Sequence, residues 1–304
     1  MKTRLVIAAL LLVALVWPLA LPTPLLASEP PETQWTKTFG GTNYEEGNSV
    51  QQTSDGGYII ASTTNSSGAG SYDVYLIKTD SNGNMVWSNT FGGAGWDWGN
   101  SVQPTSDGGY IITGWTDSFG AGFADVYLIK TDSSGNITWS KTLGGVGSDG
   151  ANSIQPTKDG GYIIAGSTSS FVAGDYYDVY LIKTDSSGNI TWSKTLGGAS
   201  GDGASSMQPT KDGGYIIVGE TWSIGAGMAD VWLIKVAALL PGDATGDGAV
   251  DARDITKVER IIAHLDPPTP GADANQDGLV DARDITQVEI IIIAALGQPK
   301  SVGN

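Results

Sequence analysis

The sequence contains no cysteine and only one histidine among its 304 residues. Without cysteine, the chain can form no disulfide framework, offers no thiol nucleophile and cannot carry a lipid on a mature N-terminal cysteine. The single histidine, His264, lies near the C-terminus. A Ser-His catalytic pair and a histidine metal site are therefore excluded from the rest of the chain.

Basic residues are also scarce. The sequence has 16 Lys and Arg against 32 Asp and Glu, which gives a formal net charge of −16. This balance argues against nucleic acid as a partner, because little positive charge is available to neutralise phosphates. Runs that favour helices are few, whereas 43 glycines and many aromatic residues indicate a mostly β body. The length is sufficient for two domains.

One long apolar run occurs, at the N-terminus. Lys2 and Arg4 precede an apolar stretch over residues 5–21, and the small residue Ala27 follows. A basic start, an apolar centre and a small residue at the cut site predict a secretory signal peptide. The alternative is a retained membrane anchor, because the run approaches spanning length. Both interpretations place the body outside the cytoplasm, as a secreted, extracellular or cell-surface protein, with a membrane partner only if the segment is retained.

A twelve-residue acidic pattern occurs twice near the C-terminus. Oxygen-bearing side chains stand at positions 1, 3, 5, 9 and 12 of each copy, and Gly248 and Gly278 stand at position 6. This is the spacing of a calcium loop, in which the glycine allows the sharp turn. The pattern predicts two calcium ions, held by Asp243, Thr245, Asp247, the Ala249 carbonyl, Asp251 and Asp254, and by Asp273, Asn275, Asp277, the Leu279 carbonyl, Asp281 and Asp284.

Within each loop, position 9 is expected to act through a water and position 12 to close the site with both carboxylate oxygens. Position 12 is Asp where Glu is usual, so the chain must approach the ion more closely. The alternative interpretation is a pair of acidic, glycine-rich turns that hold no metal.

A helix is expected after each loop and not before it. Apolar residues follow the loops at helical spacing, at Ile255, Val258, Ile261, Ile262 and Leu265, and at Ile285, Val288, Ile291, Ile292 and Leu296. Residues 239–242 and 267–271 contain helix-breaking Pro and Gly. A loop followed by a helix, occurring twice and linked by prolines, resembles the type I dockerin domain over roughly residues 241–297.

The resemblance implies that calcium orders the two helices and that the partner is a cohesin-like module on a scaffold or surface protein. It further implies that loop positions 10 and 11 and the outer helix faces contact this partner, which gives Ala252, Arg253, Arg260, Ala282, Arg283 and Ile290. Cellulosomal dockerins often carry Ser-Thr at positions 10 and 11. The Ala-Arg found here argues against a cellulosomal partner and leaves a different cohesin or surface protein open.

Between these two ends the chain repeats itself. Trp35, Trp87, Trp139 and Trp192 lie 52, 52 and 53 residues apart. Two motifs recur with them: Asp-Gly-Gly-Tyr-Ile-Ile from Asp55, Asp107, Asp159 and Asp212, and Asp-Val-Tyr/Trp-Leu-Ile-Lys from Asp73, Asp125, Asp178 and Asp230. One unit predicts four short antiparallel strands, which is the composition of a propeller blade. The repeats resemble propeller repeats of bacterial and archaeal surface proteins, a family whose members mostly lack an assigned activity.

The strand count predicts how the ring closes. A strand of the fourth type, residues 35–39, precedes all others, and the last unit stops at Lys235 without one. We therefore expect a four-bladed propeller closed by its N-terminal strand. The alternative is a single eight-bladed ring made by two chains. The repeat tryptophans are expected to pack between blades.

Aromatic and acidic residues supply the candidate ligand site of the propeller. Loops between the fourth and first strands carry Glu45, Glu46, Asp97, Asp149 and Asp202. They are expected to share one face with Trp96, Trp98, Trp115, Asp117 and Trp222. Rings beside carboxylates suit sugar binding, and paired carboxylates can cleave glycosides. The acids occupy equivalent positions in each unit, however, which favours a structural role in turns.

The predicted fold is mostly β, with a small α-helical dockerin-like domain that carries two calcium loops. The expected divisions are a signal peptide at 1–27, a leader at 28–34, the propeller at 35–236, a linker at 237–241, the dockerin-like domain at 242–297 and a tail at 298–304. The sequence favours a non-catalytic binding protein whose propeller recognises a glycan or a protein. The alternatives are a dockerin-borne polysaccharide-active enzyme, a hydrolase or a lyase, and a structural surface-layer protein with a stabilising calcium module.

Overall fold

The computed structural model describes residues 32–172, 174, 176–237, 242, 250, 252–269, 271–274 and 279–296. The predicted signal peptide and most of the leader lie outside these residues. By its contacts the chain divides into two compact units, Met1–Thr36 and Lys37–Asn304. Within the described residues, no helix has the length and apolar character needed to cross a membrane.

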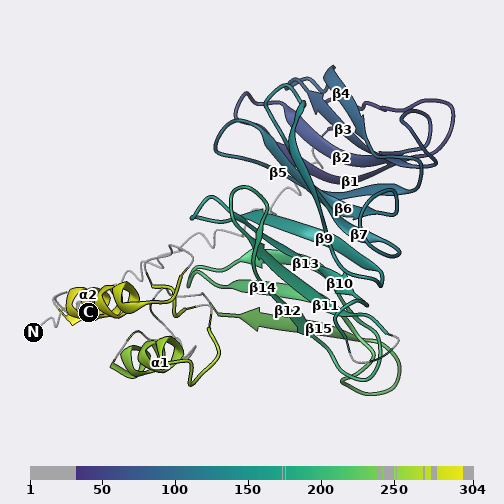
Figure 1. The fold of residues 1–304 in the computed structure, drawn as a ribbon. Coiled ribbons are helices and arrows are strands. Elements are labelled where there is room, and N and C mark those ends of the chain that lie inside the picture. The colour runs from purple at the N-terminus through teal and green to yellow at the C-terminus, as the bar shows by residue number, and fades with distance from the viewer. Residues whose placement is uncertain are drawn as a thin grey trace, which may run out of the picture. The chain divides into compact units, whose positions relative to one another are not determined.

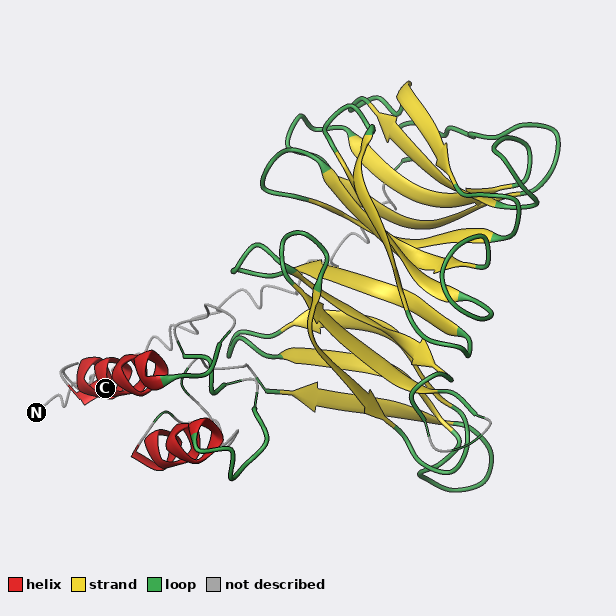
Figure 2. Ribbon diagram, in the orientation of Figure 1, coloured by secondary structure: helices red, strands yellow, loops and turns green. Residues whose placement is uncertain are grey.

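Fifteen strands and two helices make up the described elements (Figures 1 and 2). The first sheet contains β1 (Glu45–Gln52), β2 (Tyr58–Thr64), β3 (Asp73–Thr79) and β4 (Met85–Phe91). The second contains β5 (Asp97–Pro104), β6 (Tyr110–Thr116), β7 (Asp125–Thr131) and β8 (Ile137–Leu143). The third contains β9 (Asp149–Pro156), β10 (Tyr162–Thr168), β11 (Asp178–Thr184) and β12 (Ile190–Leu196). The fourth contains β13 (Asp202–Pro209), β14 (Tyr215–Thr221) and β15 (Asp230–Val236). Neighbouring strands are antiparallel and follow chain order in every sheet, as the repeats predict.

The Asp-Gly-Gly motif forms the turn between the first two strands of each sheet. In the second sheet the Asp107 carboxylate accepts hydrogen bonds from the backbone N of Gly109 at 3.1 Å and from Lys130 Nζ at 2.8 Å. Gly108, between Asp107 and Gly109, has a φ of +82°, a conformation that other residues rarely adopt. Partial burial opposes ionisation of Asp107, but its bonds to Lys130 and Thr105 outweigh this and lower its pKa to about 2. The turn therefore ties the third strand to the hairpin that precedes it.

The hydrophobic core lies between consecutive sheets. One cluster joins Leu76 of the first sheet to Ile112 of the second, and similar clusters join the second sheet to the third and the third to the fourth. Three of the repeat tryptophans, Trp87, Trp139 and Trp192, lie at these junctions as expected, whereas Trp35 is exposed. The ring of Trp87, for example, lies 5.9 Å from that of Tyr110 on the following sheet. Each sheet thus buries an apolar face against its neighbour in the chain.

The ring closure expected from the strand count is not seen. Residues 35–39 form no strand, and the fourth sheet has three strands with β15 at its edge. Among the described elements, the first and fourth sheets share no contact comparable with those between consecutive sheets. Lys37 Nζ instead donates to Asn84 Oδ1 at 2.9 Å, in the turn before β4. This bond places Lys37 at the first sheet and not beside β15.

The C-terminal region contains α1 (Ala252–Ile262) and α2 (Ala282–Leu296). Val258 and Val288 are fully buried between the two helices, as the helical spacing predicts. The expectation that Leu265 continues the first helical face is wrong. His264 adopts a φ of +56°, which ends the helix, and Leu265 is exposed.

Candidate calcium-binding and ligand-binding sites

Both acids at loop position 12 are fully buried. Asp254 lies in the first turn of α1 and Asp284 in the first turn of α2, and each has an exposed fraction of 0%. The helix N-terminus favours a negative charge, but the removal of a carboxylate from water costs several kcal/mol unless a compensating charge is present. The two loops therefore bury their position-12 acids in the same way.

The second loop shows how the acid is held. Asp284 Oδ2 accepts a hydrogen bond from the backbone N of Asp281 at 2.7 Å, so the loop turns back onto the helix start. The Asp281 carboxylate is half-buried and pairs with Arg283, whose Nη2 lies 2.6 Å from Oδ2. Hydrogen bonds from Arg283 lower the pKa of Asp281 and keep it ionised. Asp273, at position 1, is half-buried as well.

Among the residues that the structure describes, no group of three or more acids lies close enough together to hold a metal ion by itself. Asp254, Asp273, Asp281 and Asp284 supply only oxygen donors, which is the ligand chemistry that calcium prefers. Leu279, whose carbonyl is the expected ligand at position 7, has an exposed side chain. The other expected ligands lie outside the described residues, namely Asp243, Thr245, Asp247, Ala249, Asp251, Asn275 and Asp277.

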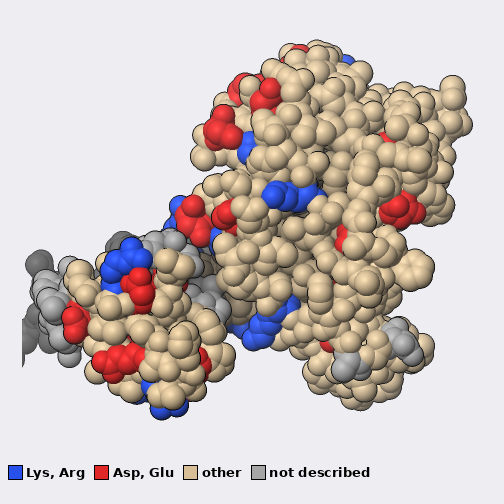
Figure 3. All heavy atoms as spheres, in the orientation of Figure 1, with Lys and Arg blue, Asp and Glu red and all other residues tan. Residues whose placement is uncertain are grey.

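All six residues expected to contact a partner are exposed. They are Ala252, Arg253, Arg260, Ala282, Arg283 and Ile290. Arg260 is fixed by Asp266, because its Nε and Nη2 each donate to that carboxylate at 2.9 Å. Ile290 exposes 53% of its surface on α2. In Figure 3, acidic and basic side chains are interspersed with uncharged ones on the visible face.

The structure brings three of the four candidate tryptophans together. The rings of Trp98 and Trp115 stack 5.8 Å apart at an interplanar angle of 11°, and Tyr72 contacts both Trp96 and Trp98. Tyr44 extends the group by an edge contact with Tyr72. We call these five residues the aromatic patch. It spans the junction of the first two sheets.

Trp222 does not belong to the patch. It is exposed on the loop that follows β14, in the fourth sheet, and its backbone N donates to the Gly201 carbonyl at 2.9 Å. Two acids lie beside the patch. The Tyr44 hydroxyl donates to Glu46 at 2.7 Å, and the Asp117 carboxylate accepts the backbone N of Trp96. The patch therefore combines partly exposed rings with carboxylates.

Sequence reasoning missed Tyr44 and Tyr72. The signal is present where the repeats differ, since the other units place Trp96, Ser148 and Gly201 at the position of Tyr44. Ala124 and Ala229 take the position of Tyr72 in two of the other units. Aromatic residues at positions that two of the sister repeats fill with small ones indicate a feature beyond the scaffold.

The repeated acids occupy a different environment from the patch. Asp97, Asp149 and Asp202 are buried, and each meets the aspartate that starts the third strand of the preceding sheet, namely Asp73, Asp125 and Asp178. A Cβ at Gly92, Gly144 or Gly197 would collide with both carboxylates of its pair. These three buried acids cannot reach a polysaccharide, which supports a structural role for them, whereas Glu45 and Glu46, the candidate acids of the first unit, are half-buried.

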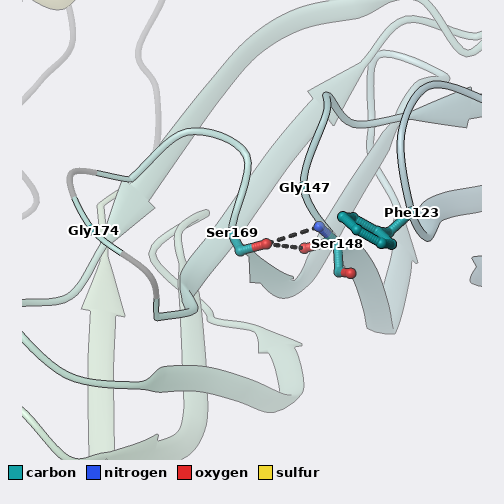
Figure 4. A pocket seen from close by; sticks show the side chains of 5 residues that line it. All are labelled: Phe123, Gly147, Ser148, Ser169 and Gly174. Carbon is teal, nitrogen blue, oxygen red and sulfur yellow. Dashed lines mark hydrogen bonds between the residues drawn. The ribbon is translucent and has the colours of Figure 1, made fainter.

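A pocket lies at the next junction. It has a volume of about 350 Å³ and is lined by Phe123, Gly147, Ser148, Ser169 and Gly174 (Figure 4). Ser169 Oγ accepts the backbone N of Ser148 at 2.8 Å and donates to the Ser148 carbonyl at 3.2 Å. Both bonds engage the Ser169 hydroxyl, which holds the two loops together. The lining residues carry no ionisable side chain, so the pocket does not have the make-up of a catalytic site.

Comparison with known proteins identifies the C-terminal region. Residues 241–292 match the family model of the dockerin type I domain. No match was found among curated proteins. Among solved structures, the chain is similar to a protein of unknown function from Bacteroides caccae, with 12% identity and a TM-score of 0.42. That match covers 65% of this chain and 66% of the other, so this chain spans just under two thirds of that protein's length.

Proposed function

We propose, from the dockerin type I match of residues 241–292, that this protein is a non-catalytic, extracellular binding protein attached through a calcium-dependent contact with a cohesin module. A dockerin domain implies a cohesin partner, and such domains occur in secreted or cell-surface proteins. In this proposal the four sheets from β1 to β15, which we call the repeat body, carry the second binding activity and recognise a glycan or a protein.

The observation that carries the docking function is the pair of fully buried acids, Asp254 and Asp284, at the starts of two packed helices. Their carboxylate oxygens are of the ligand type that calcium prefers. The carboxylates fix the helix starts, and Ala252 and Ala282, at loop position 10, lie on exposed surface. Metal binding is thereby coupled to presentation of the docking face. We propose two ions, one for each loop.

Glycan recognition is supported by the aromatic patch. An exposed indole such as Trp96 can stack on the C–H face of a sugar, while Glu46 and Asp117 can accept hydroxyl protons. Trp98 Nε1 is buried without a hydrogen-bond partner. Packing between two sheets does not require a partly exposed stack of this size. The third and fourth sheets pack with Ser167 and Glu220 at the position that Trp115 takes in the second sheet.

The docking proposal predicts binding to immobilised cohesin modules that requires calcium and is lost in chelator. Asp254→Ala combined with Asp284→Ala should reduce binding at least 100-fold in calcium, because the helix starts lose their anchor. Asp132→Ala, in an exposed hairpin turn of the repeat body, is the matched control and should bind normally. Equal binding by the double variant and the parent would contradict the proposal, and calcium-dependent unfolding without cohesin binding would favour a structural calcium module.

The glycan proposal predicts signals on a glycan array for the full chain. Trp96→Ala should weaken them about 5-fold or more, because loss of one stacked ring costs on the order of 1 kcal/mol or above. Trp222→Ala removes an equally exposed indole outside the patch and should leave the signals unchanged. If both variants bind like the parent, the patch is not the glycan site. Hydrolysis of an array polysaccharide by the chain would support the enzyme alternative.

A further inference from the structure

The last strand exposes residues that its counterparts bury. Val126 and Leu128 of β7 have exposed fractions of 0%, whereas Val231 and Leu233, at the same positions of β15, expose 81% and 65%. A following sheet covers β7, but no described sheet faces this side of β15. An apolar surface shaped for a neighbouring sheet thus lies open at one end of the repeat body.

The first sheet carries the other half of the same junction. Val50 of β1 exposes 59%, whereas Val102, its counterpart in β5, exposes 0%. At the internal junction the backbone N of Val102 also donates to Ser49 Oγ at 3.3 Å. Ser206 takes the place of Ser49 in the last sheet and is exposed. The two ends of the repeat body therefore match each other as consecutive sheets do.

The fourth strand that the last sheet lacks also indicates that the two ends of the repeat body match. Within the chain, Lys141 of β8 donates to Asn189 Oδ1 at 2.8 Å, which joins a fourth strand to the hairpin turn of the next sheet. Lys37 makes the same bond to Asn84 at 2.9 Å. Lys37 thus stands where the fourth strand of a preceding sheet would stand. Among the residues that the structure describes, no sheet precedes the one that contains β1, and β15 pairs with a strand on one side only.

We propose that two copies of this chain join end to end, with residues 35–39 of each copy adding the fourth strand beside β15 of the other. The occupant is a second copy because the required surface and strand exist together at the opposite end of the same repeat body. Two four-sheet bodies make an eight-bladed ring, which falls within the usual range of about four to eight blades. Closure covers both apolar ends and removes both free edges, which an open chain of sheets cannot do.

The register of the new strand pair follows from the internal one. Leu181 of β11 pairs with Lys194 of β12. Leu233 and Lys37 occupy the corresponding positions, so they should be opposite each other across the two copies. Because the chain has no cysteine, Leu233→Cys with Lys37→Cys introduces two thiols per chain, which form two equivalent crosslinks in the proposed dimer. Oxidation should convert this double variant of the full chain into a covalent dimer on a non-reducing gel.

The oligomeric state gives the second measurement. Sedimentation of the full chain at micromolar concentration should give twice the mass of one chain. Val231→Lys should shift the protein to one chain mass, because it places a charge in the buried joint. Val146→Lys is the control, since Val146 is equally exposed, at 79%, on a loop and should leave the dimer intact.

Two results would overturn the proposal. A parent protein with the mass of one chain would show that the ends do not associate. A crosslink formed within a single chain by the double cysteine variant would show that the repeat body closes on itself as a four-bladed ring.

Discussion

At the scale of single residues, the junctions between sheets contain paired acids that the repeats alone did not reveal. Asp73 at the start of β3 and Asp97 at the start of β5 are both buried, and each has an Oδ1 atom without a hydrogen-bond partner. Burial, and then the charge of Asp97, raise the pKa of Asp73. The raised pKa favours the protonated form of Asp73 in the folded protein.

This pairing predicts the effect of Asp73→Asn. The amide keeps an acceptor for the backbone N of Ala69 and adds a donor toward Asp97. We expect the variant to be more stable than the parent by roughly 1 kcal/mol at about pH 7, the scale of one hydrogen bond. Protonated Asp73 contributes stability below the ordinary aspartate pKa, and this contribution is lost as pH rises through its raised pKa. The gain should therefore vanish near pH 4.

Urea unfolding of parent and variant, followed at several pH values in parallel, checks this prediction. Because both proteins share every other titrating group, the difference between them isolates Asp73. A difference that does not change with pH, or a variant less stable than the parent at neutral pH, would show that Asp73 is ionised and satisfied in the folded protein.

At the scale of elements, the helices and strands depend on different sources of stability. The strands are joined into sheets whose buried faces form three large clusters. The helices α1 and α2 share one small cluster around Val258 and Val288. A core of this size is marginal without a metal, because the apolar surface that it buries is small compared with the entropy lost on ordering.

We therefore expect chelation to unfold the helices and leave the strands folded. At calcium 100-fold above the Kd, bound ion contributes about 2.7 kcal/mol to the stability of the helical region. Chelator should remove the helical circular-dichroism signal and its thermal transition, while the transition of the sheets stays unchanged. Asp254→Ala with Asp284→Ala should reproduce this effect in calcium. Loss of both transitions together would contradict the division into two domains.

At the scale of the whole molecule, the repeat body is defined by its ends. Three internal junctions bury the same positions, and the two outer faces leave those positions exposed at Val50 and Val231. The N-terminal segment lies at the end opposite to the strand that lacks a partner. The strand count showed that the last sheet lacks a fourth strand, but it could not decide whether the same chain or a second chain supplies that strand.

The pattern of the sequence determined the local structure because short-range chemistry controls it. The Asp-Gly-Gly motif sets each turn through the bonds of residues such as Asp107 and through glycine's tolerance of positive φ. The apolar residues of the repeated strands stand at the same positions in every unit, so each unit forms the same strands. The acidic spacing also predicted where α1 and α2 begin, since Asp254 and Asp284 lie in their first turns.

Only the tertiary structure decided which distant residues meet. It joined Tyr44 and Tyr72 to the tryptophans of the next unit, paired Asp73 with Asp97, and left Trp222 outside the patch. It also left the ring open where strand counting predicted closure. The physical reason is that such contacts depend on how sheets stack across a junction, and this stacking is set by side-chain packing over the whole face of a sheet, which no short stretch of sequence encodes.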